Sequence, residues 1–231
     1  MRAMILAAGR GERMRPLTDL WPKPLLEAGG RSLIEHHLYR LAGAGFTEVV
    51  INLGHLGHLI PPRLGDGSRY GLRIDYSPEP PGALETGGGI QHALGLLGEA
   101  PFLLINGDIW SEHPLADLRT ALAAGDLAHV VLAPNPPHKP QGDFALVDGR
   151  VRDDLDPRLT YCGLGVIDPR LFVGHAPGRF PLAPLLTAAM TEDAVSGELH
   201  RGDWRDIGTP ARLAALNDKL LERNDGSAVS G

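Results

Sequence analysis

Cysteine, lysine and long apolar runs are all scarce in this chain. The 231 residues include one cysteine, Cys162, so no disulfide can form within the chain, as is typical of a reducing compartment. No apolar run approaches the roughly 20 residues needed to cross a bilayer, and we expect no membrane partner. Met1 is followed almost directly by an apolar run, which leaves no room for a secretory signal, so we expect a cytoplasmic protein.

An excess of positive charge is also missing. The chain has 22 Lys and Arg against 28 Asp and Glu, for a net charge of −6, which argues against a broad nucleic-acid surface. Its lysines are Lys23, Lys139 and Lys219. An acidic protein that binds anionic substrates must therefore gather its cations locally.

Cations do gather in the segment from Leu6 to Leu25. A short apolar strand, Ala3–Ala8, leads into a loop with two glycines, which let backbone amides approach an anion closely. Arginines fork onto phosphate oxygens, and a lysine between prolines is a cation on a stiff backbone. The segment holds Gly9, Gly11, Arg10, Arg13, Arg15 and, between Pro22 and Pro24, Lys23. This arrangement predicts a polyphosphate site.

Two commoner glycine motifs are absent. The dinucleotide fingerprint needs a third glycine where Met14 stands and a helix that opens at once, which Pro16 and Pro22 disfavour. The Walker pattern needs Gly-Lys-Ser/Thr, which the segment lacks. An ordinary strand–turn connection with solvated arginines remains the alternative.

Strands and helices alternate through the first two-thirds of the chain. We predict strands at Ala3–Ala8, Glu48–Leu53, Leu72–Tyr76, Pro101–Ile105 and His129–Ala133, and helices at Leu33–Ala44, Leu56–Leu64, Thr86–Leu97 and Leu115–Ala124. Ser32 and Glu35 form a capping box for the first of these helices. Such alternation predicts an α/β fold with a mostly parallel, Rossmann-like sheet flanked by helices.

The pattern changes after residue 134. A proline-rich stretch, Asn135–Gln141, precedes a hairpin that turns at Asp148-Gly149. Further elements are a strand at Leu164–Ile167, a helix at Leu182–Met190, a short strand at Trp204–Ile207 and a closing helix at Pro210–Arg223. We predict a single domain over residues 1–223 with a small β subregion in its second half, and a flexible tail over 224–231.

The sequence Gly-x-Gly-x-Arg followed by Pro-Lys-Pro-Leu resembles the nucleotide-binding segment of sugar-1-phosphate nucleotidyltransferases. These enzymes join a nucleoside triphosphate to a sugar 1-phosphate and release pyrophosphate. The resemblance reaches about Leu216 and implies a nucleotide-binding half over about 1–134 and a sugar-binding half over about 135–223. Segments 84–89, 106–108, 142–144 and 204–209 resemble the branch of the family that uses UTP and N-acetylmuramate 1-phosphate in cell-wall recycling.

Two aspartates match the family's magnesium ligands. Asp108 follows the apolar strand Pro101–Ile105, and ligands of parallel sheets bind beyond the carboxyl ends of strands. The resemblance implies that Asp206 is the second ligand, with Asp203 as the alternative. The ordinary interpretations are a turn aspartate for Asp108 and a helix cap for Asp206, although Thr209 is better placed to cap.

The resemblance also implies roles in nucleotide binding. Arg13 and Lys23 match the cations that grip the phosphates and, with Asp108, are the predicted catalytic residues. The predicted nucleotide-binding residues are Ala8, Gly9, Gly11, Glu12, Arg13, Lys23 and, beside the base, Gly88. The ordinary interpretation of Gly88 is a helix start with a flexible glycine run.

On the sugar side, Asn106, Gly142 and Asp143 match positions that contact the sugar. The chain departs from the hexose enzymes of the family, which carry a Glu-Lys-Pro whose lysine binds the sugar phosphate. Asp153 to Pro157 stands in that region, and the replacement cation is Lys139, Arg152 or Arg158. This departure argues against a standard glucose or mannose enzyme. Another sugar or phosphocholine acceptor, or a non-catalytic sensor of sugar nucleotides, remains the alternative.

Overall fold

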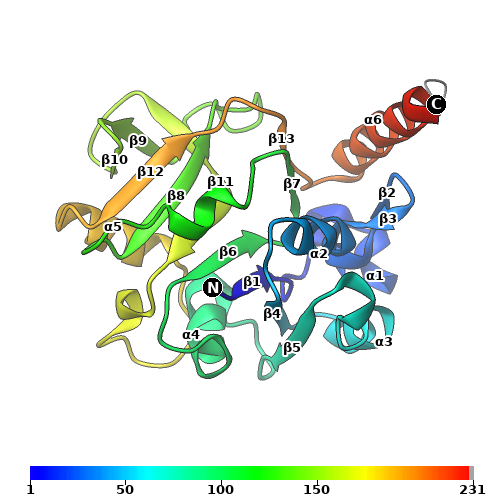
Figure 1. Cartoon of the computed structure of the whole chain (residues 1–231), viewed down its shortest axis with the longest axis horizontal. Coiled ribbons are helices and arrows are strands. Elements are labelled where there is room, and N and C mark those ends of the chain that lie inside the picture. The colour runs from blue at the N-terminus through cyan, green and yellow to red at the C-terminus, as the bar shows by residue number, and fades with distance from the viewer. Residues whose placement is uncertain (229–231) are drawn as a thin grey trace.

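The computed structural model describes residues 1–228, with side chains described up to residue 223. Its centre is a sheet with the strand order β5-β4-β1-β6-β11-β8-β12-β10-β9 (Figure 1). The strands are β1 (Ala3–Leu6), β4 (Glu48–Leu53), β5 (Arg73–Pro78), β6 (Phe102–Asn106), β8 (Ala128–Ala133), β9 (Phe144–Val147), β10 (Arg150–Arg152), β11 (Arg158–Ile167) and β12 (Val195–Leu199).

The sheet has a parallel part and a mixed part. Strands β5, β4, β1 and β6 are parallel neighbours, as the alternating pattern predicted. Strand β11 runs antiparallel between β6 and β8, while β12 is parallel to β8. The predicted hairpin β9–β10 comes last in the strand order, and β9 also pairs antiparallel with β11; the hairpin turn has positive φ angles at Asp148 and Gly149. The fold is therefore α/β, with the mixed strands in its second half.

Helices cover both faces of the sheet because alternate strand residues point to opposite sides. Ile5 and Ile51 face a core that includes α2 (Leu33–Gly43) and α3 (Ile60–Leu64). Met4 and Val50 face a second core with α4 (Glu85–Leu97) and α5 (Ala183–Thr191). The predicted capping box of α2 is present, since Ser32 and Glu35 bond to each other reciprocally.

Short elements complete the fold. They are α1 (Leu17–Leu20), the ladder of β2 (Glu27–Ala28) with β3 (Arg31–Ser32), the ladder of β7 (Ile109–Ser111) with β13 (Trp204–Asp206), and the 3-10 turns Glu12–Met14, Lys23–Leu25, Gly57–Leu59, Ser68–Tyr70, Asp117–Thr120 and Pro169–Phe172. The β7–β13 ladder joins the two halves of the chain (Figure 1).

Two sequence predictions need correction. The predicted helix Leu115–Ala124 is wrong, because that segment contains a single 3-10 turn. The closing helix, α6 (Pro210–Ala228), extends past Arg223 into the predicted tail, and residues 229–231 lie outside the described residues. Within residues 1–228, no helix has both the length and the apolar character needed to span a membrane.

Candidate active site

The loop after β1 lines a pocket of about 500 Å³. Gly11 turns the chain with a φ of +61°, and the Met14 amide donates to its carbonyl at 2.8 Å. A Cβ at Gly11 would lie 2.9 Å from Thr18 Cγ2 and 3.2 Å from Lys23 Cβ, so the tight packing of this loop requires glycine. The pocket wall includes the predicted nucleotide-binding residues Ala8, Gly9, Gly11, Glu12, Arg13 and Lys23.

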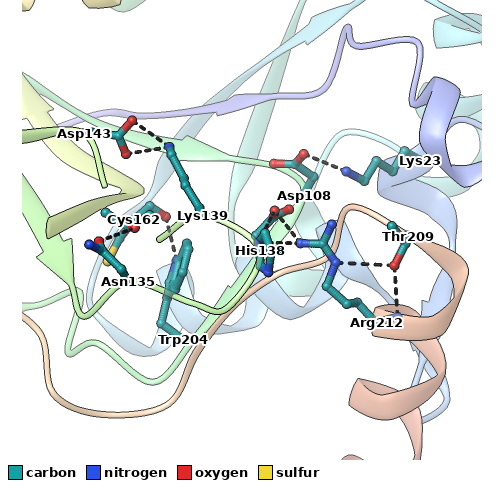
Figure 2. Close-up of polar contacts among 12 residues, drawn as sticks. Lys23, Asp108, Asn135, His138, Lys139, Asp143, Cys162, Trp204, Thr209 and Arg212 are labelled. Atoms are coloured by element: carbon teal, nitrogen blue, oxygen red, sulfur yellow. Dashed lines mark hydrogen bonds and ion pairs between the residues drawn. The ribbon is translucent and has the colours of Figure 1, made fainter. Parts of the chain in front are cut away.

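Lys23 is almost buried in the wall of this pocket, with 8% of the residue exposed. Its Nζ lies 2.6 Å from Oδ2 of Asp108 (Figure 2). Asp108 follows β6, and the intervening Gly107 is confined because a Cβ there would lie 2.6 Å from the carbonyl of Leu6. The fold thus joins a predicted phosphate-binding cation to a predicted metal ligand.

Asp206 reaches the same region from the other half of the chain. In the β7–β13 ladder Asp206 pairs with Ile109, the neighbour of Asp108, and the Ile207 amide donates to the Asp108 carbonyl at 2.9 Å. The Asp206 carboxylate accepts a hydrogen bond from Arg212 Nη1 at 2.6 Å. Two aspartates that are distant in sequence therefore become neighbours through one backbone register.

Asp203, the alternative ligand, has a different environment. Its carboxylate pairs with Lys219 and, at 3.2 Å, with Arg205. Burial raises the pKa of Asp203, but the hydrogen bonds from Lys219 and Arg205 outweigh it and hold that pKa below its usual value. Asp203 lines neither the first pocket nor its neighbour, whereas Asp206 does line the neighbour. The geometry favours Asp206.

The two aspartates suit a magnesium ion that shares its ligands with substrate. Carboxylate oxygens are hard ligands, and Mg²⁺ in nucleotide enzymes usually binds one or two protein carboxylates together with phosphates. Among residues 1–228, no group of three or more His, Cys, Asp and Glu side chains is placed to hold a metal by itself. The donor set fits a metal whose remaining ligands come from substrate.

A second pocket, of about 320 Å³, adjoins the first. Strand β11 shifts register between Tyr161 and Gly165 where it pairs with β8. Within this irregularity Gly163 has a φ of +71°, and a Cβ there would lie 2.7 Å from Asn106 Nδ2. Gly163 thus leaves room for the Asn106 side chain. Both pockets are lined by Leu6, Arg13, Thr86, Asn106 and Asp108.

Asp143 lies in the second pocket together with Asn106. Its carboxylate accepts from the Tyr161 amide at 2.8 Å and pairs with Lys139 Nζ at 2.6 Å. Gly142 lines neither pocket, and its φ of +67° brings a would-be Cβ within 2.7 Å of Asn135 Oδ1. The structure gives Gly142 the role of turning the chain so that Asp143 enters the pocket, and sugar contact by Gly142 stays a prediction.

Gly88, like Gly142, is a predicted site residue that lies outside the lining of both pockets. Its amide donates to the Phe180 carbonyl at 3.0 Å. A Cβ there would lie 2.1 Å from the carbonyl oxygen of Gly178. Close packing of α4 against the segment 178–181 accounts for this glycine. Its neighbours Glu85 and Thr86 do line the first pocket.

Sequence reasoning missed a polar pair in the first pocket, Asn52 and Glu79. Asn52 Oδ1 accepts from the Ala7 amide at 2.7 Å, and Asn52 Nδ2 donates to Glu79 at 2.7 Å. Glu79 also accepts from the Leu84 amide at 3.1 Å. The pair ties the β1 loop to the start of α4. The signal in the sequence was a single asparagine in the apolar run Val49–Leu53.

Cys162 is fully buried. It lines the second pocket, and burial raises the pKa of its thiol to about 12. A thiol with that pKa carries almost no thiolate near neutral pH. Cys162 therefore shapes the pocket and is a poor nucleophile.

The model of the family described as nucleotidyl transferase matches residues 2–147, more than half of the chain. The chain belongs to the nucleotidyltransferase family. The family resemblance found in the sequence is thus confirmed, and the chain is an enzyme of the sugar-1-phosphate nucleotidyltransferase type.

Relatives of this nucleotidyltransferase match it almost end to end. It is 52% identical over 220 residues to the N-acetylmuramate alpha-1-phosphate uridylyltransferase of Neisseria meningitidis. The aligned residues make up 92% of this chain and 95% of that protein. The protein of that name from Caulobacter vibrioides is 39% identical over 95% of this chain and 97% of its own length. A mannose-1-phosphate guanyltransferase of Aspergillus fumigatus is 30% identical over all of this chain and 70% of its own length.

A solved structure shares the fold. It is described as a glucose-1-phosphate thymidylyltransferase from Bacillus anthracis and superposes with a TM-score of 0.83 over 96% of both chains. With 20% sequence identity, this likeness confirms the α/β fold alone.

Proposed function

We propose that this nucleotidyltransferase transfers the uridylyl group of UTP to N-acetylmuramate α-1-phosphate, giving UDP-N-acetylmuramate and pyrophosphate in peptidoglycan recycling in the cytoplasm. The observation that carries the proposal is the pair of adjoining pockets that share Arg13, Asn106 and Asp108. The first pocket has the glycines and cations of a polyphosphate cradle. The relatives at 52% and 39% identity support the choice of sugar and nucleotide.

The chemistry suits a single in-line displacement. An oxygen of the sugar 1-phosphate attacks the α-phosphorus of UTP, the bond to the β-phosphate oxygen breaks, and pyrophosphate leaves. The attacking oxygen is already anionic at neutral pH, so no general base is needed. The task of the protein is to hold two anions in line at the junction of the pockets and to neutralise their charge.

Named residues fit this task. Arg13 lines both pockets and is thus suited to neutralise the departing pyrophosphate, and Lys23 adds a nearly buried cation beside Asp108. Asp108 and Asp206 would hold magnesium, which supplies Lewis-acid neutralisation of the phosphates when bound. On the sugar side, Asn106 offers a donor and an acceptor, and Asp143 offers acceptors for sugar hydroxyls.

The test is pyrophosphate release in the presence of magnesium. UTP, dTTP, CTP and GTP are each combined with the 1-phosphates of N-acetylmuramate, N-acetylglucosamine, glucose and mannose. We expect strong release only with UTP and N-acetylmuramate 1-phosphate. Release with mannose 1-phosphate and GTP would instead follow the more distant relative at 30% identity. Folded protein that binds a nucleotide sugar and releases no pyrophosphate with any pair would support the sensor alternative.

A further inference from the structure

A proline-rich loop, residues 135–142, borders the second pocket and has no role in the displacement described above. Pro136, Pro137 and Pro140 restrict its backbone. Asn135 fastens its base, because Nδ2 donates to the Pro140 carbonyl at 3.0 Å and Oδ1 accepts from Thr160 at 2.8 Å. Such a loop holds its backbone, and so the starting points of its side chains, in defined positions.

Two neighbouring side chains of this loop reach different carboxylates of the second pocket. His138 Nε2 lies 3.2 Å from Oδ2 of Asp206, the predicted metal ligand. Lys139 Nζ lies 2.6 Å from Asp143, the predicted sugar ligand (Figure 2). The loop therefore brings a cation to the sugar-binding aspartate rather than to the reacting phosphates.

The charges around the pocket give Lys139 a distinct place. Arg13 lines both pockets and serves the phosphates at their junction, whereas Lys139 lines the second pocket alone. The 1-phosphate of a neutral sugar is charged only at the phosphate, so its ring needs no cation beside it. An acidic sugar carries a further carboxylate that loses water on binding and needs a partner.

The other two cations considered as replacements lie elsewhere. Arg158 donates to the Asp143 carbonyl at 2.9 Å and to Asp153 at 3.0 Å. Arg152 pairs with Asp193 at 2.6 Å. Neither arginine lines the second pocket. Lys139 is thus the candidate that the fold brings to the substrate.

We propose that Lys139 binds a carboxylate on the sugar ring of the acceptor and thereby makes the enzyme prefer an acidic amino-sugar 1-phosphate to a neutral one. The identity of that acceptor, N-acetylmuramate 1-phosphate, rests on the proposed function. It differs from N-acetylglucosamine 1-phosphate by a lactyl ether that ends in a carboxylate. An ammonium group has three donors, so Lys139 can hold this carboxylate while it keeps Asp143. Its side chain is 43% exposed, which leaves it free to turn toward substrate.

The experiment compares kcat/KM for the two acceptors, with UTP and magnesium, in wild type, Lys139→Gln and Lys139→Arg. We expect Lys139→Gln to lower the ratio of N-acetylmuramate to N-acetylglucosamine 1-phosphate by about tenfold or more. Lys139→Arg should retain much of the preference because it keeps the charge. Arg152→Gln is the matched control, since Arg152 also pairs with an aspartate but lies outside the pocket, and its ratio should equal that of wild type.

A binding measurement accompanies the kinetics, so that slow turnover of one acceptor does not obscure the result. In Lys139→Gln, the preference for UDP-N-acetylmuramate over UDP-N-acetylglucosamine, measured as the ratio of calorimetric Kd values, should fall by the same factor as the kcat/KM ratio. Equal losses for both sugars in Lys139→Gln would assign Lys139 to the shared phosphate and overturn this inference, while the proposed function stands. The absence of any loss for either sugar in Lys139→Gln would overturn it as well.

A wild-type enzyme without preference for the acidic sugar would overturn both the choice of acceptor and the role of Lys139. If Lys139→Gln unfolds at a lower temperature than wild type, Lys139→Ala is added. The kcat/KM ratio of the two acceptors is then measured at a temperature where Lys139→Gln and Lys139→Ala are both folded. The same drop in ratio is expected there.

Discussion

Asp108 lies at the junction of the two pockets and pairs with Lys23 at 2.6 Å. Asp108→Asn keeps the shape of the side chain but removes the charge that would hold a metal. We expect kcat to fall by about 10³-fold or more, because electrostatic stabilisation at such sites is worth several kcal/mol. Pyrophosphate release measures the loss, and an unchanged thermal unfolding midpoint shows that the fold is intact. Near-normal turnover by the folded variant would remove Asp108 from the mechanism.

The roles of Asp206 and Asp203 can be distinguished by replacing each aspartate with asparagine. Asp206→Asn should lower kcat by about 10²-fold or more and weaken the dependence on magnesium concentration. Asp203→Asn should leave kcat within about threefold of wild type while it lowers the free energy of unfolding by about 1 kcal/mol, since Lys219 and Arg205 lose a partner. Magnesium titrations of initial rate and urea unfolding give the two readouts. The reverse pattern would make Asp203 the metal ligand.

The phosphate-loop residues could be recognised from one local segment, whereas Asp206 was placed with Asp108 only through the family resemblance and the Asn52–Glu79 pair was missed. Arg13 and Lys23 stand in a motif whose glycines and prolines are visible in the chain. The partners of Asn52, and the closeness of Asp206 to Asp108, depend on which strands pair. Gly88 has a packing role that the glycine run did not reveal, and base contact by Gly88 stays a prediction.

At the scale of the elements, the β1 loop offers a pair of glycines with different constraints. Gly11 has a φ of +61° and a crowded Cβ position, whereas no atom would lie within 4 Å of a Cβ at Gly9. Gly11→Ala should lower the unfolding free energy by about 1–2 kcal/mol and, by moving Lys23, raise the KM for UTP. Gly9→Ala should leave the unfolding midpoint unchanged. An unfolding midpoint of Gly11→Ala equal to that of wild type would show that the loop adapts.

The elements that periodicity predicted well are those buried on both faces or stabilised at their ends. β4 has the predicted bounds because Glu48–Leu53 is a nearly continuous apolar run. The helix predicted at Leu115–Ala124 failed because the tertiary contacts override its propensity: Leu115 and Leu118 enter the core, and Arg119 bonds to the Gly45 carbonyl. Strands β7 and β12 are short, and long-range pairing defines them.

On the scale of the whole molecule, the candidate active site lies where two differently built parts of the sheet meet. The parallel half supplies the phosphate loop and Asp108, and the mixed half supplies Asp143 and Asp206. The family model matches residues 2–147, and the relatives at 52% and 39% identity cover 92% and 95% of the chain, so the likeness to known proteins reaches into the second half as well. Alternation of strands and helices predicted the first half, but the bulge in β11 that makes room for Asn106 lies in a strand that pairs with β6, β8 and β9, and local sequence does not reveal those pairings.

The whole fold also carries a pH dependence through its buried histidines. Burial is the largest cause that lowers the pKa of His36, His37, His113 and His129, and for His37 burial and then Arg40 lower the pKa to about 3. The unfolded chain takes up a proton near pH 6.5, whereas folded His37 stays neutral. Stability from His37 is therefore full above about pH 6.5 and is lost progressively as the pH falls toward 3.

We expect the free energy of unfolding to fall by at least about 1.4 kcal/mol between pH 7.5 and 5.5, the share of His37 alone. Urea unfolding at pH 7.5, 6.5 and 5.5 measures it. Carboxylates with a lowered pKa, such as Glu35, contribute only at lower pH, so this window isolates the histidines. His37→Phe should flatten the decline by about that amount, and His58→Gln, at an exposed position, should not. A full decline in His37→Phe would mean that folded His37 binds a proton despite its burial.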